Sequence, residues 1–544
     1  MITVHALFAH TAARAPQAEF LFVEAVTAAA YGLEPGAIAW GEAAREVERL
    51  CAAYAAAGYG HGHRVGLLLE NRPAFLLHWF ALNALGASVV PINAEMRAAE
   101  LQYLIGHSEI CLAVALAERA DALRAAARAA GVALHVVCAA EGEPLPPPPS
   151  AAPHADALPA LASECALLYT SGTTGRPKGC ILSNDYFLRA GRWYAGLGGL
   201  CGVRRDAERI ITPLPLNHVN AMAFSTMVVL TAGGCLVQLD RFHPKHWWGS
   251  VRESRASIVH YLGVMPALLL AAPESPAEHA LGVRWGFGAG VDRKNHAPFE
   301  QRFGFPLIEA WAMTETGAAA CVMANHEPRH VGTSCFGRAE DFVETRLVDD
   351  DGRDVPDGTP GELLVRSAGA DPRRWFFSGY LKDAAATEEA WAGGWFHTGD
   401  MVRRDAAGEL YFVDRKKNVI RRSGENISAV EVESVLNQHP AVKACAVAAA
   451  PDALRGDEVL ACVVTREPVA AQERAALASS IVRHALAQLA YYKAPGHVAF
   501  VDELPLTASQ KIQRGELREM ARSLPGKPNC WDMRELKRRR KKRE

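Results

Sequence analysis

Residues 169–179 have the composition of a loop that could hold a chain of phosphates. They read Tyr-Thr-Ser-Gly-Thr-Thr-Gly-Arg-Pro-Lys-Gly and directly follow the apolar run 165–168. The run predicts a buried strand, and the loop after it offers backbone N–H groups, four hydroxyls and the Lys178 ammonium as donors. The Walker pattern Gly-x-x-x-x-Gly-Lys-Ser/Thr does not fit this spacing. The segment therefore indicates a nucleotide site unlike that of the usual ATPases; a surface turn rich in Ser, Thr and Gly is the alternative.

Three other segments carry groups suited to the remaining parts of a nucleotide. Within 309–317, Thr314 can donate to a phosphate, and Glu315 supplies the hard oxygen that Mg²⁺ prefers. Asp400 follows a glycine in a turn, where its carboxylate can accept the ribose hydroxyls, and Arg415 offers a guanidinium to ribose and phosphates. Alone, Thr314 is a typical helix cap and Asp400 a typical turn residue.

Histidine, glycine and lysine residues elsewhere extend this set. His218 lies in the segment Pro-Leu-Pro-Leu-Asn-His, although a lone histidine is more often structural. The glycines of 286–290 do not form a dinucleotide fingerprint, because Val291 stands where its last glycine belongs, so they indicate a turn. Lys511 is a cation near the carboxyl end that can stabilise negative charge developing in a transition state.

The hydrophobic pattern predicts a scaffold of alternating helices and strands around these segments. Helices are expected over 43–58, 74–85 and 115–131, and strands over 64–69, 87–92 and 132–138. Short strands separated by helices are typical of a largely parallel α/β sheet. After a strand at 409–413, the pattern predicts helices over 429–438 and 472–489 and strands over 443–449, 458–464 and 497–501. These later elements are sufficient for a small α+β domain of their own.

Composition limits the class of protein. A chain of 544 residues exceeds what one hydrophobic core usually supports, so we expect at least two domains. The net charge is -2, and the twelve cysteines include no Cys-x-x-Cys pair, which favours free thiols in a reducing compartment. We expect neither a signal peptide nor a transmembrane stretch, and we expect a cytoplasmic protein. The basic run 537–543 is typical of a solvated tail; RNA or an anionic membrane is the alternative ligand for it.

Six of these motifs, in this order from Tyr169 to Arg514, resemble those of the adenylate-forming superfamily. That superfamily contains acyl-CoA synthetases, aryl-CoA ligases, peptide-synthetase adenylation domains and beetle luciferases. The resemblance implies an α/β fold with a large N-terminal adenylate-forming domain of several subdomains and a smaller, mobile α+β C-terminal domain. The implied parts are 1–414 with the ATP and acyl sites, 415–520 with the hinge and catalytic lysine, and 521–544 as a basic tail.

The resemblance also implies roles for individual residues. The ATP site is expected to comprise Thr170, Ser171, Gly172, Thr173, Thr174, Lys178, Gly288, Ala289, Glu309, Ala310, Trp311, Thr314, Asp400 and Arg415. The acyl pocket is expected to comprise His218, Asn220, Met222, Ala223, Tyr261, Gly263, Gly290, Trp311 and Met313. Further expectations are Ser423, Gly424 and Glu425 for coenzyme A, Lys417 for the hinge, Glu315 and Thr173 for Mg²⁺, and Lys511, His218, Glu315 and Thr314 for catalysis.

Two positions depart from the superfamily's pattern. Trp311 and the alanine after it stand where Tyr-Gly is usual, which changes the space beside adenine, and Gln510 stands where glycine usually precedes the catalytic lysine.

Peptide-synthetase domains hold an α-ammonium group with an Asp in the acyl-pocket motif, whereas 218–222 contains no carboxylate. An amino-acid substrate is therefore disfavoured.

The implied activity is an acid–CoA ligase that works in two halves. A carboxylate attacks the α-phosphorus of ATP with release of pyrophosphate, and the thiol of coenzyme A then displaces AMP. The segment 242–266, together with 412–415 and 423–428, looks most like crotonobetaine/carnitine–CoA ligases and their relatives for short or medium acids. A betaine would need aromatic faces, which Tyr194, Phe224, Tyr261 and Trp311 offer.

The alternative functions are an adenylating enzyme with another acceptor and a non-catalytic nucleotide-binding protein. We expect no nucleic-acid partner, and both a monomer and a homo-oligomer are compatible with the sequence.

Overall fold

The structure, a computed structural model, describes residues 2–138, 145–170, 176–279, 281–291, 293–349, 351–415, 420–427, 429–505, 512 and 514–537. Its internal contacts divide the chain into two compact units. The first unit consists of Met1–Ala94, Ile105–Tyr169 and Gly179–Asp414, and the second of Glu95–Leu104, Thr170–Lys178 and Arg415–Glu544. Within the described residues, no helix has the length and apolar character that crossing a membrane requires.

An eight-stranded sheet of the first unit carries many of the predicted site residues. Its strand order is β14-β13-β12-β11-β9-β10-β1-β2, and the strands from β13 to β1 are parallel to their neighbours. The antiparallel strands β14 and β2 close the two edges. The strands are β1 (Glu19–Val23), β2 (Gly36–Ala39), β9 (Arg209–Thr212), β10 (Cys235–Gln238), β11 (Ile258–Leu262), β12 (Trp285–Ala289), β13 (Leu307–Trp311) and β14 (Val322–Met323).

A seven-stranded sheet, in the order β18-β8-β7-β4-β3-β5-β6, contains the strands expected before residue 140. Strands β6, β5, β3, β4 and β7 are parallel to their neighbours, which confirms the predicted sheet type. The strands are β3 (Arg64–Leu68), β4 (Ser88–Pro91), β5 (Ile110–Ala115), β6 (His135–Cys138), β7 (Glu164–Thr170), β8 (Lys178–Ser183) and β18 (Gly379–Tyr380). Strand β7 is the buried strand predicted before the phosphate-type loop.

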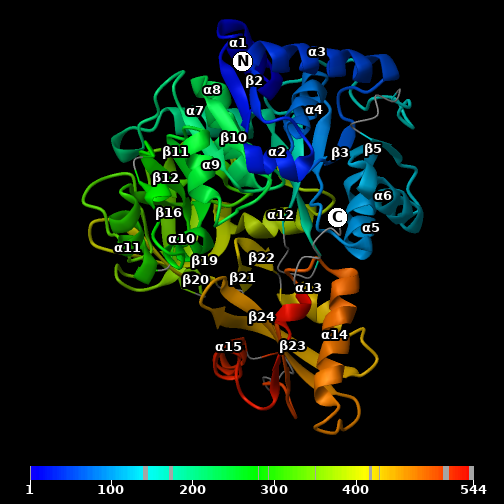
Figure 1. The fold of residues 1–544 in the computed structure, drawn as a ribbon, viewed down its shortest axis with the longest axis vertical. Helices are drawn as coiled ribbons and strands as arrows, with labels where there is room; N and C mark the ends of the chain where they lie inside the picture. Colours follow the sequence, from blue (N-terminus) through cyan, green and yellow to red (C-terminus); the bar gives the residue numbers. More distant parts are fainter. Residues whose placement is uncertain are drawn as a thin grey trace. The chain divides into compact units, whose positions relative to one another are not determined.

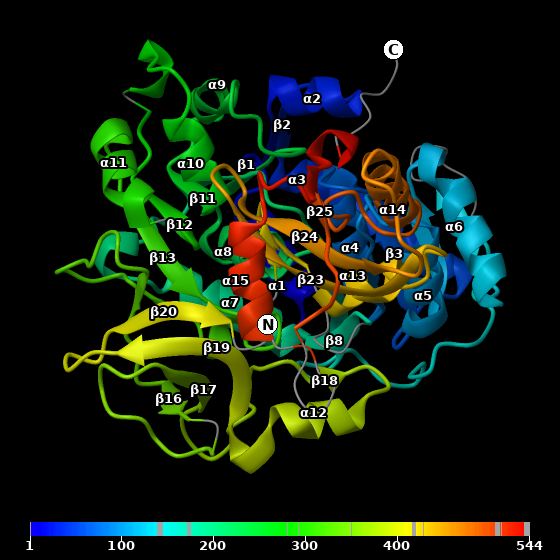
Figure 2. The same ribbon diagram turned by 90° about the horizontal axis from the view of Figure 1, so that it is seen from below.

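A third, antiparallel sheet completes the first unit and is drawn in yellow and green in Figure 2. Its order is β15-β20-β19-β17-β16. The strands are β15 (Cys335–Gly337), β16 (Val343–Val348), β17 (Gly361–Ser367), β19 (Phe396–Arg404) and β20 (Leu410–Arg415). Of these, only β20 was expected from the sequence.

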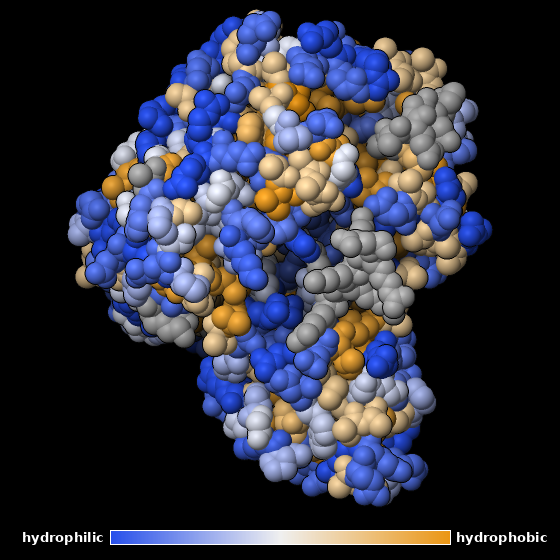
Figure 3. All heavy atoms as spheres, viewed as in Figure 1, coloured by the Kyte–Doolittle hydropathy of each residue, from blue (hydrophilic) through white to orange (hydrophobic). Residues whose placement is uncertain are grey.

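Helices lie beside the sheets (Figure 1). Apolar side chains from helices and strands fill the core. Helices α3 and α6 end at Gly58 and Gly131, which adopt the left-handed conformation that glycine tolerates best. Hydrophilic residues cover much of the face in Figure 3. The helices before residue 415 are α1 (Val4–Arg14), α2 (Ala25–Tyr31), α3 (Trp40–Ala57), α4 (Pro73–Ala84), α5 (Ala98–Ser108), α6 (Ala117–Ala130), α7 (Asn184–Ala195), α8 (Thr226–Ala232), α9 (Trp247–Glu253), α10 (Val264–Leu270), α11 (Arg293–Phe303) and α12 (Ala384–Ala390).

The second unit has a six-stranded sheet of its own and a separate apolar core. Strands β22-β21-β24-β25-β26 form its main path, and β23 pairs with β24. Its strands are β21 (Ile420–Arg422), β22 (Glu425–Ile427), β23 (Val442–Asp452), β24 (Gly456–Thr465), β25 (His497–Phe500) and β26 (Cys530–Asp532), and its helices are α13 (Ala429–Leu436), α14 (Arg474–Gln488) and α15 (Arg514–Ser523). The predicted α+β elements are all present, and α15 continues beyond residue 521, where the sequence placed the start of the tail.

The structure corrects the expectation that the basic run 537–543 is solvated from its first residue. Lys537 is buried, and its ammonium forms an ion pair with the fully buried Glu458. Arg422 pairs with the same carboxylate at 2.8 Å. Nothing in the sequence indicated the burial of Lys537, because it follows from the pairing of β26 with β25, which brings the chain back to the sheet. Residues 538–543 lie outside the described part of the chain.

Candidate active site

Four neighbouring parallel strands of the eight-stranded sheet have their carboxyl ends side by side. We call these carboxyl ends and the residues directly after them the edge of the sheet. After β9, β11, β12 and β13 the chain becomes partly exposed at residues 217–220, 262–264, 289–290 and 312–314. The carboxyl ends of adjacent parallel strands are where α/β proteins bind their ligands. Most of the residues predicted to form the acyl pocket therefore lie in or beside one edge, including His218, Asn220, Gly263, Gly290 and Met313.

Glu309 is directed at the turn that follows β12. Its carboxylate accepts hydrogen bonds from the Tyr261 hydroxyl at 3.1 Å, the Gly290 amide at 2.9 Å and the Val291 amide at 3.1 Å. Burial raises the pKa of Glu309, and the three donors act against that rise. The sequence predicted Glu309 as an ATP contact; in the structure its carboxylate fixes the shape of the edge.

Two glycines of this edge have no room for a side chain. A Cβ on Gly263 would overlap the carbonyl oxygen of Gly290, and one on Gly288 would overlap the carbonyl oxygen of Tyr261. The strand ends pack backbone to backbone here, which only glycine permits. These glycines therefore define how closely the β11 and β12 ends approach one another.

Trp311 binds the side chain of Asp400. The indole nitrogen donates to Oδ2 of Asp400 at 2.9 Å, and the two residues are 6% and 1% exposed. The Asp400 backbone N–H donates to the Thr398 hydroxyl, which itself donates to the Leu363 carbonyl. The departure from Tyr-Gly thus has a structural consequence, because the indole orients the carboxylate predicted to meet ribose.

Two tyrosines that no motif marked hold the Thr314–Glu315 segment. The Tyr380 hydroxyl donates to the Glu315 carboxylate at 2.9 Å, and the Tyr186 hydroxyl donates to the Thr314 carbonyl at 2.9 Å. Burial and then the charge of Glu315 raise the pKa of Tyr380, so it remains a donor. The tyrosines lie 65 and 128 residues from their partners, which is why sequence spacing gave no sign of them.

The donor set at Glu315 fits Mg²⁺ bound largely by substrate. Among the described residues, no group of three or more His, Cys, Asp or Glu side chains forms a metal cluster. Mg²⁺ at nucleotide sites is commonly held by one or two carboxylates together with phosphates and water. Glu315 supplies one such carboxylate, and the other predicted ligand, Thr173, lies outside the described residues.

A buried polar network lies beside the residues that follow His218. Asn220 begins a π-helix (Asn220–Ser225), and its side-chain oxygen lies 2.7 Å from Nδ1 of His260. The Ser225 hydroxyl lies 2.8 Å from the same nitrogen, and the Tyr194 hydroxyl lies 2.9 Å from Nε2. Burial lowers the pKa of His260 to about 3, so the imidazole is neutral. Sequence reasoning did not single out His260.

Several predicted residues are core residues or fall outside the description. Met222 and Ala223 are completely buried. Thr170 and Lys178 end β7 and begin β8, on either side of the predicted phosphate loop. The predicted positions outside the described residues are Ser171, Gly172, Thr173, Thr174, Lys417, Gln510 and Lys511, and for Arg415, the last residue of β20, the side chain is also outside.

The predicted coenzyme A contacts form a tight hairpin in the second unit. Strands β21 and β22 pair antiparallel, with Arg422 opposite Glu425. The two residues between them, Ser423 and Gly424, have φ of 51° and 86°, the signs that a two-residue type I′ turn requires. The Ser423 amide also donates to the Arg455 carbonyl at 2.9 Å. The backbone of this turn is therefore fixed from both sides.

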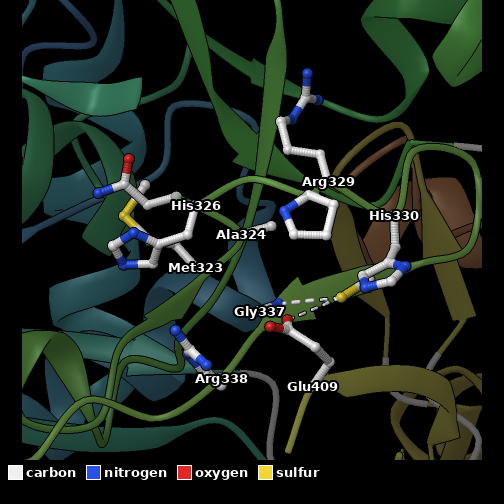
Figure 4. Close-up of a pocket in the computed structure, with 11 residues that line it drawn as sticks. Met323, Ala324, His326, Arg329, His330, Gly337, Arg338 and Glu409 are labelled. Atoms are coloured by element: carbon white, nitrogen blue, oxygen red, sulfur yellow. Dashed lines mark hydrogen bonds between the residues drawn. The ribbon is translucent and has the colours of Figure 1, made fainter. Parts of the chain in front are cut away.

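A small pocket lies beside β14 and β15 (Figure 4). Cys335 donates its thiol hydrogen toward Glu409 at 3.5 Å and accepts from the Gly337 amide at 3.4 Å. Burial and the neighbouring carboxylate raise the pKa of Cys335 to about 12, so it is an unreactive thiol. No predicted site residue lines this pocket. Its lining is Met323, Ala324, Asn325, His326, Pro328, Arg329, His330, Cys335, Gly337, Arg338 and Glu409.

Solved structures share this fold over almost the whole chain. An o-succinylbenzoate CoA synthetase from Bacillus subtilis matches with a TM-score of 0.78 at 23% identity and covers 94% of this chain and 98% of its own. An amide bond synthetase from Marinactinospora thermotolerans matches with the same TM-score and identity and covers 94% and 99%. At this level of identity the likeness concerns the fold alone.

Curated proteins match at higher identity. A sulfoacetate–CoA ligase from Cupriavidus necator is 33% identical over 494 residues, which is 88% of this chain and 92% of that protein. A crotonobetaine/carnitine–CoA ligase from Salmonella paratyphi A is 29% identical over 489 residues, covering 87% and 91%. Residues 8–381 match the family described as AMP-binding enzyme, and residues 431–511 match the AMP-binding enzyme C-terminal domain. The chain therefore belongs to the adenylate-forming superfamily of AMP-binding enzymes.

Proposed function

We propose that the chain, an AMP-forming acid–CoA ligase, converts a carboxylic acid to its CoA thioester through an acyl-adenylate. ATP, the acid and coenzyme A are the substrates, and pyrophosphate and AMP leave. The observation that carries this proposal is a pair of carboxylates held in place by aromatic donors. Tyr380 donates to Glu315, and Trp311 donates to Asp400. Both carboxylates belong to the same unit as the partly exposed segment 217–220. The CoA ligases among the curated relatives support the choice of acceptor.

The residues of the first unit are proposed to position ATP. Thr314 donates to the α-phosphate, Asp400 accepts from ribose, and Glu315 provides the protein carboxylate for Mg²⁺. When bound, Mg²⁺ offsets the negative charge of the phosphates. Tyr380 and Trp311 act on their carboxylates before any substrate arrives, so the site is preorganised. Transfer at phosphorus depends mostly on such positioning and electrostatics, which agrees with a proposed set of loops and donors in which no residue is assigned as a covalent nucleophile.

The second unit is proposed to serve both half-reactions. Lys511 bridges the attacking carboxylate and the α-phosphate during adenylation. The hairpin turn at Ser423 and Gly424 then lies along the pantetheine arm of coenzyme A during thioester formation, with Lys417 as the hinge residue between the two arrangements. The fixed backbone of that turn supports the second role, because an extended thiol arm needs a rigid surface beside it.

The acid is proposed to be small, either of the crotonobetaine and carnitine type or another short-to-medium acid. The curated relatives act on sulfoacetate and on crotonobetaine or carnitine, according to their names, which supports a short acid with a polar or charged end. Of the four aromatic residues considered for a betaine, Tyr194 stacks on His260 and Tyr261 is hydrogen-bonded to Glu309. Trp311 is hydrogen-bonded to Asp400, and the buried Phe224 packs against Trp193 and Phe287, so all four already serve the protein's own interior.

Two partial reactions test the proposal. Acid-dependent pyrophosphate release should be accompanied by AMP formation that depends on coenzyme A. Pyrophosphate exchange without a thioester from any acid in a panel of short, medium, aryl and betaine acids would contradict the CoA ligase and favour another acceptor. Absence of both reactions with every acid would leave a nucleotide-binding protein.

Lys511→Ala tests the proposed catalytic lysine. It should depress adenylation far more than thioester formation from a supplied acyl-adenylate, because the lysine acts on the attacking carboxylate and the α-phosphate. Lys527→Ala removes an exposed lysine of the same unit and is the matched control. Equal losses in both half-reactions of the Lys511 variant would show that the lysine does not serve adenylation specifically.

A further inference from the structure

Asn220 has its side-chain oxygen engaged by the protein and its side-chain nitrogen exposed. We infer that Asn220 is a specificity-determining residue that offers its amide N–H groups to the acid. The acid accordingly carries an oxygen acceptor, best an anionic one, in addition to the reacting carboxylate. This inference rests on the proposed function, because it concerns which acid that site selects.

The orientation of Asn220 follows from the hydrogens of the network around His260. The buried Tyr194 hydroxyl has His260 Nε2, at 2.9 Å, as its one hydrogen-bond partner among the described residues. If Nε2 carried the hydrogen, the tyrosine hydrogen would have no acceptor, which costs about 1–3 kcal/mol for a buried donor. Tyr194 therefore donates to Nε2, and the hydrogen of the neutral imidazole is on Nδ1.

The hydrogen on Nδ1 then fixes the amide of Asn220. Nδ1–H needs an acceptor, and the side-chain oxygen of Asn220 lies 2.7 Å away. A flipped amide would set a donor against a donor at this distance. The Ser225 hydroxyl, 2.8 Å from Nδ1, is also free to accept, because its own hydrogen is donated to the Asn220 backbone carbonyl at 3.3 Å. The network is satisfied with one orientation of Asn220 only.

The side-chain nitrogen of Asn220 is consequently directed away from the network. It bonds to no protein group in the part of the chain that the structure describes, and it is not buried. Asn220 follows the end of β9, and its partner His260 is on β11, the neighbouring strand of the same edge. The exposed N–H groups therefore belong to the partly exposed edge where the four parallel strands end.

Two N–H donors on one nitrogen select the chemistry of the acid. They bind sulfonate, carboxylate or carbonyl oxygens and have no lone pair to offer an ammonium group. Hydrogen bonds to an ionised acceptor are stronger than those between neutral groups. The feature thus distinguishes the two chemistries named among the curated relatives and favours the sulfonate type over the quaternary ammonium type.

Three acids of nearly equal shape test the inference. Sulfoacetate, 3,3-dimethylbutanoate and trimethylammonioacetate have a negative, a neutral and a positive group on the same CH₂–COO⁻ unit, and their homologues longer by one CH₂ form a second series. We expect kcat/KM for CoA-dependent AMP formation to be about 10- to 100-fold higher for the sulfonate than for the neutral acid in at least one series. If neither sulfonate exceeds its neutral partner, the inference is wrong, while thioester formation from any acid still upholds the proposed function.

Asn220→Asp provides the decisive variant, because it keeps the oxygen for His260 and replaces the donor by an anionic oxygen. We expect the preference to reverse, so that the trimethylammonio acid becomes a better substrate than the sulfonate.

Tyr194→Phe tests the positioning role from the other side of the imidazole. Without the tyrosine hydrogen, Nε2 can carry the proton and the amide of Asn220 can flip. The preference for the sulfonate should therefore shrink, while activity on the neutral acid remains. Unchanged preferences in both variants, with folding verified by circular dichroism, would overturn the inference.

Discussion

Replacing Trp311 with phenylalanine removes one hydrogen-bond donor from a buried carboxylate and keeps an aromatic ring. The lost bond runs over 2.9 Å from the indole nitrogen to Oδ2 of Asp400. A hydrogen bond to a charged group contributes about 1.5–3 kcal/mol, and the 1% exposure of Asp400 leaves little room for water to replace it. We expect the free energy of unfolding of the first unit to fall by that amount, in addition to the loss of packing.

The same change should weaken ATP binding, because Asp400 is the proposed acceptor for ribose. If the indole holds the carboxylate in its binding orientation, KM for ATP in pyrophosphate exchange should rise by about 10- to 100-fold, the equivalent of the same bond. KM for the acid should change less. Exchange measured at several ATP concentrations separates this effect from a general loss of activity.

Trp285→Phe is the matched control. Trp285 lies on β12 of the same sheet, is completely buried, and its indole nitrogen has no hydrogen-bond partner among the described residues. The substitution therefore removes the same ring volume without removing a bond. If the two variants lose equal stability and KM for ATP is unchanged in Trp311→Phe, the reasoning about Asp400 is refuted.

Three further changes probe other parts of the molecule. Glu458→Gln should cost the second unit about 3–5 kcal/mol in thermal or denaturant unfolding, because it leaves the buried Arg422 guanidinium without its carboxylate and removes the ion-pair partner of Lys537. Asp121→Asn at an exposed pair should have little effect. Deletion of 538–543 should leave both stability and thioester synthesis nearly intact, but a deletion that includes Lys537 should lower the melting temperature; equal effects of the two deletions would contradict the buried pair. Burial alone would raise the pKa of Glu300, but hydrogen bonds from a histidine and an arginine lower it to about 2 from the ordinary 4.5. The native state should therefore lose about 3 kcal/mol as pH falls from 4.5 through 2, and Glu300→Gln should remove that part of the acid sensitivity in unfolding curves.

Local patterns were sufficient to predict many of the elements. The helices expected over 43–58 and 74–85 are α3 and α4, because an amphipathic stripe and an apolar run each specify a helix through nearby residues. Strands β3 and β4 were predictable for the same reason. The third sheet was not, since strands such as β16 and β17 have mixed polarity and gain their hydrogen bonds only from antiparallel neighbours elsewhere in the chain.

The motifs of the site were also visible in the sequence, but their partners were not. Thr314, Glu315 and Asp400 could be proposed from residue type and order. Nothing local indicated that Tyr380 would meet Glu315 across 65 residues. The basic run shows the same limit: its charge predicted solvent exposure, and only the pairing of β26 with β25 revealed that Lys537 is buried.

The sequence by itself determined the superfamily, the nucleotide chemistry and the division into a large and a small part, because these follow from residue types and their order. Tertiary structure decided how the side chains are oriented. The indole of Trp311 lies against Asp400 over a separation of 89 residues, and the oxygen of Asn220 meets His260 over 40. Such contacts depend on which strands become neighbours, and the direction of a buried hydrogen bond depends on every donor and acceptor around it. The selectivity inferred for the acid is therefore a property of the folded network and not of any motif.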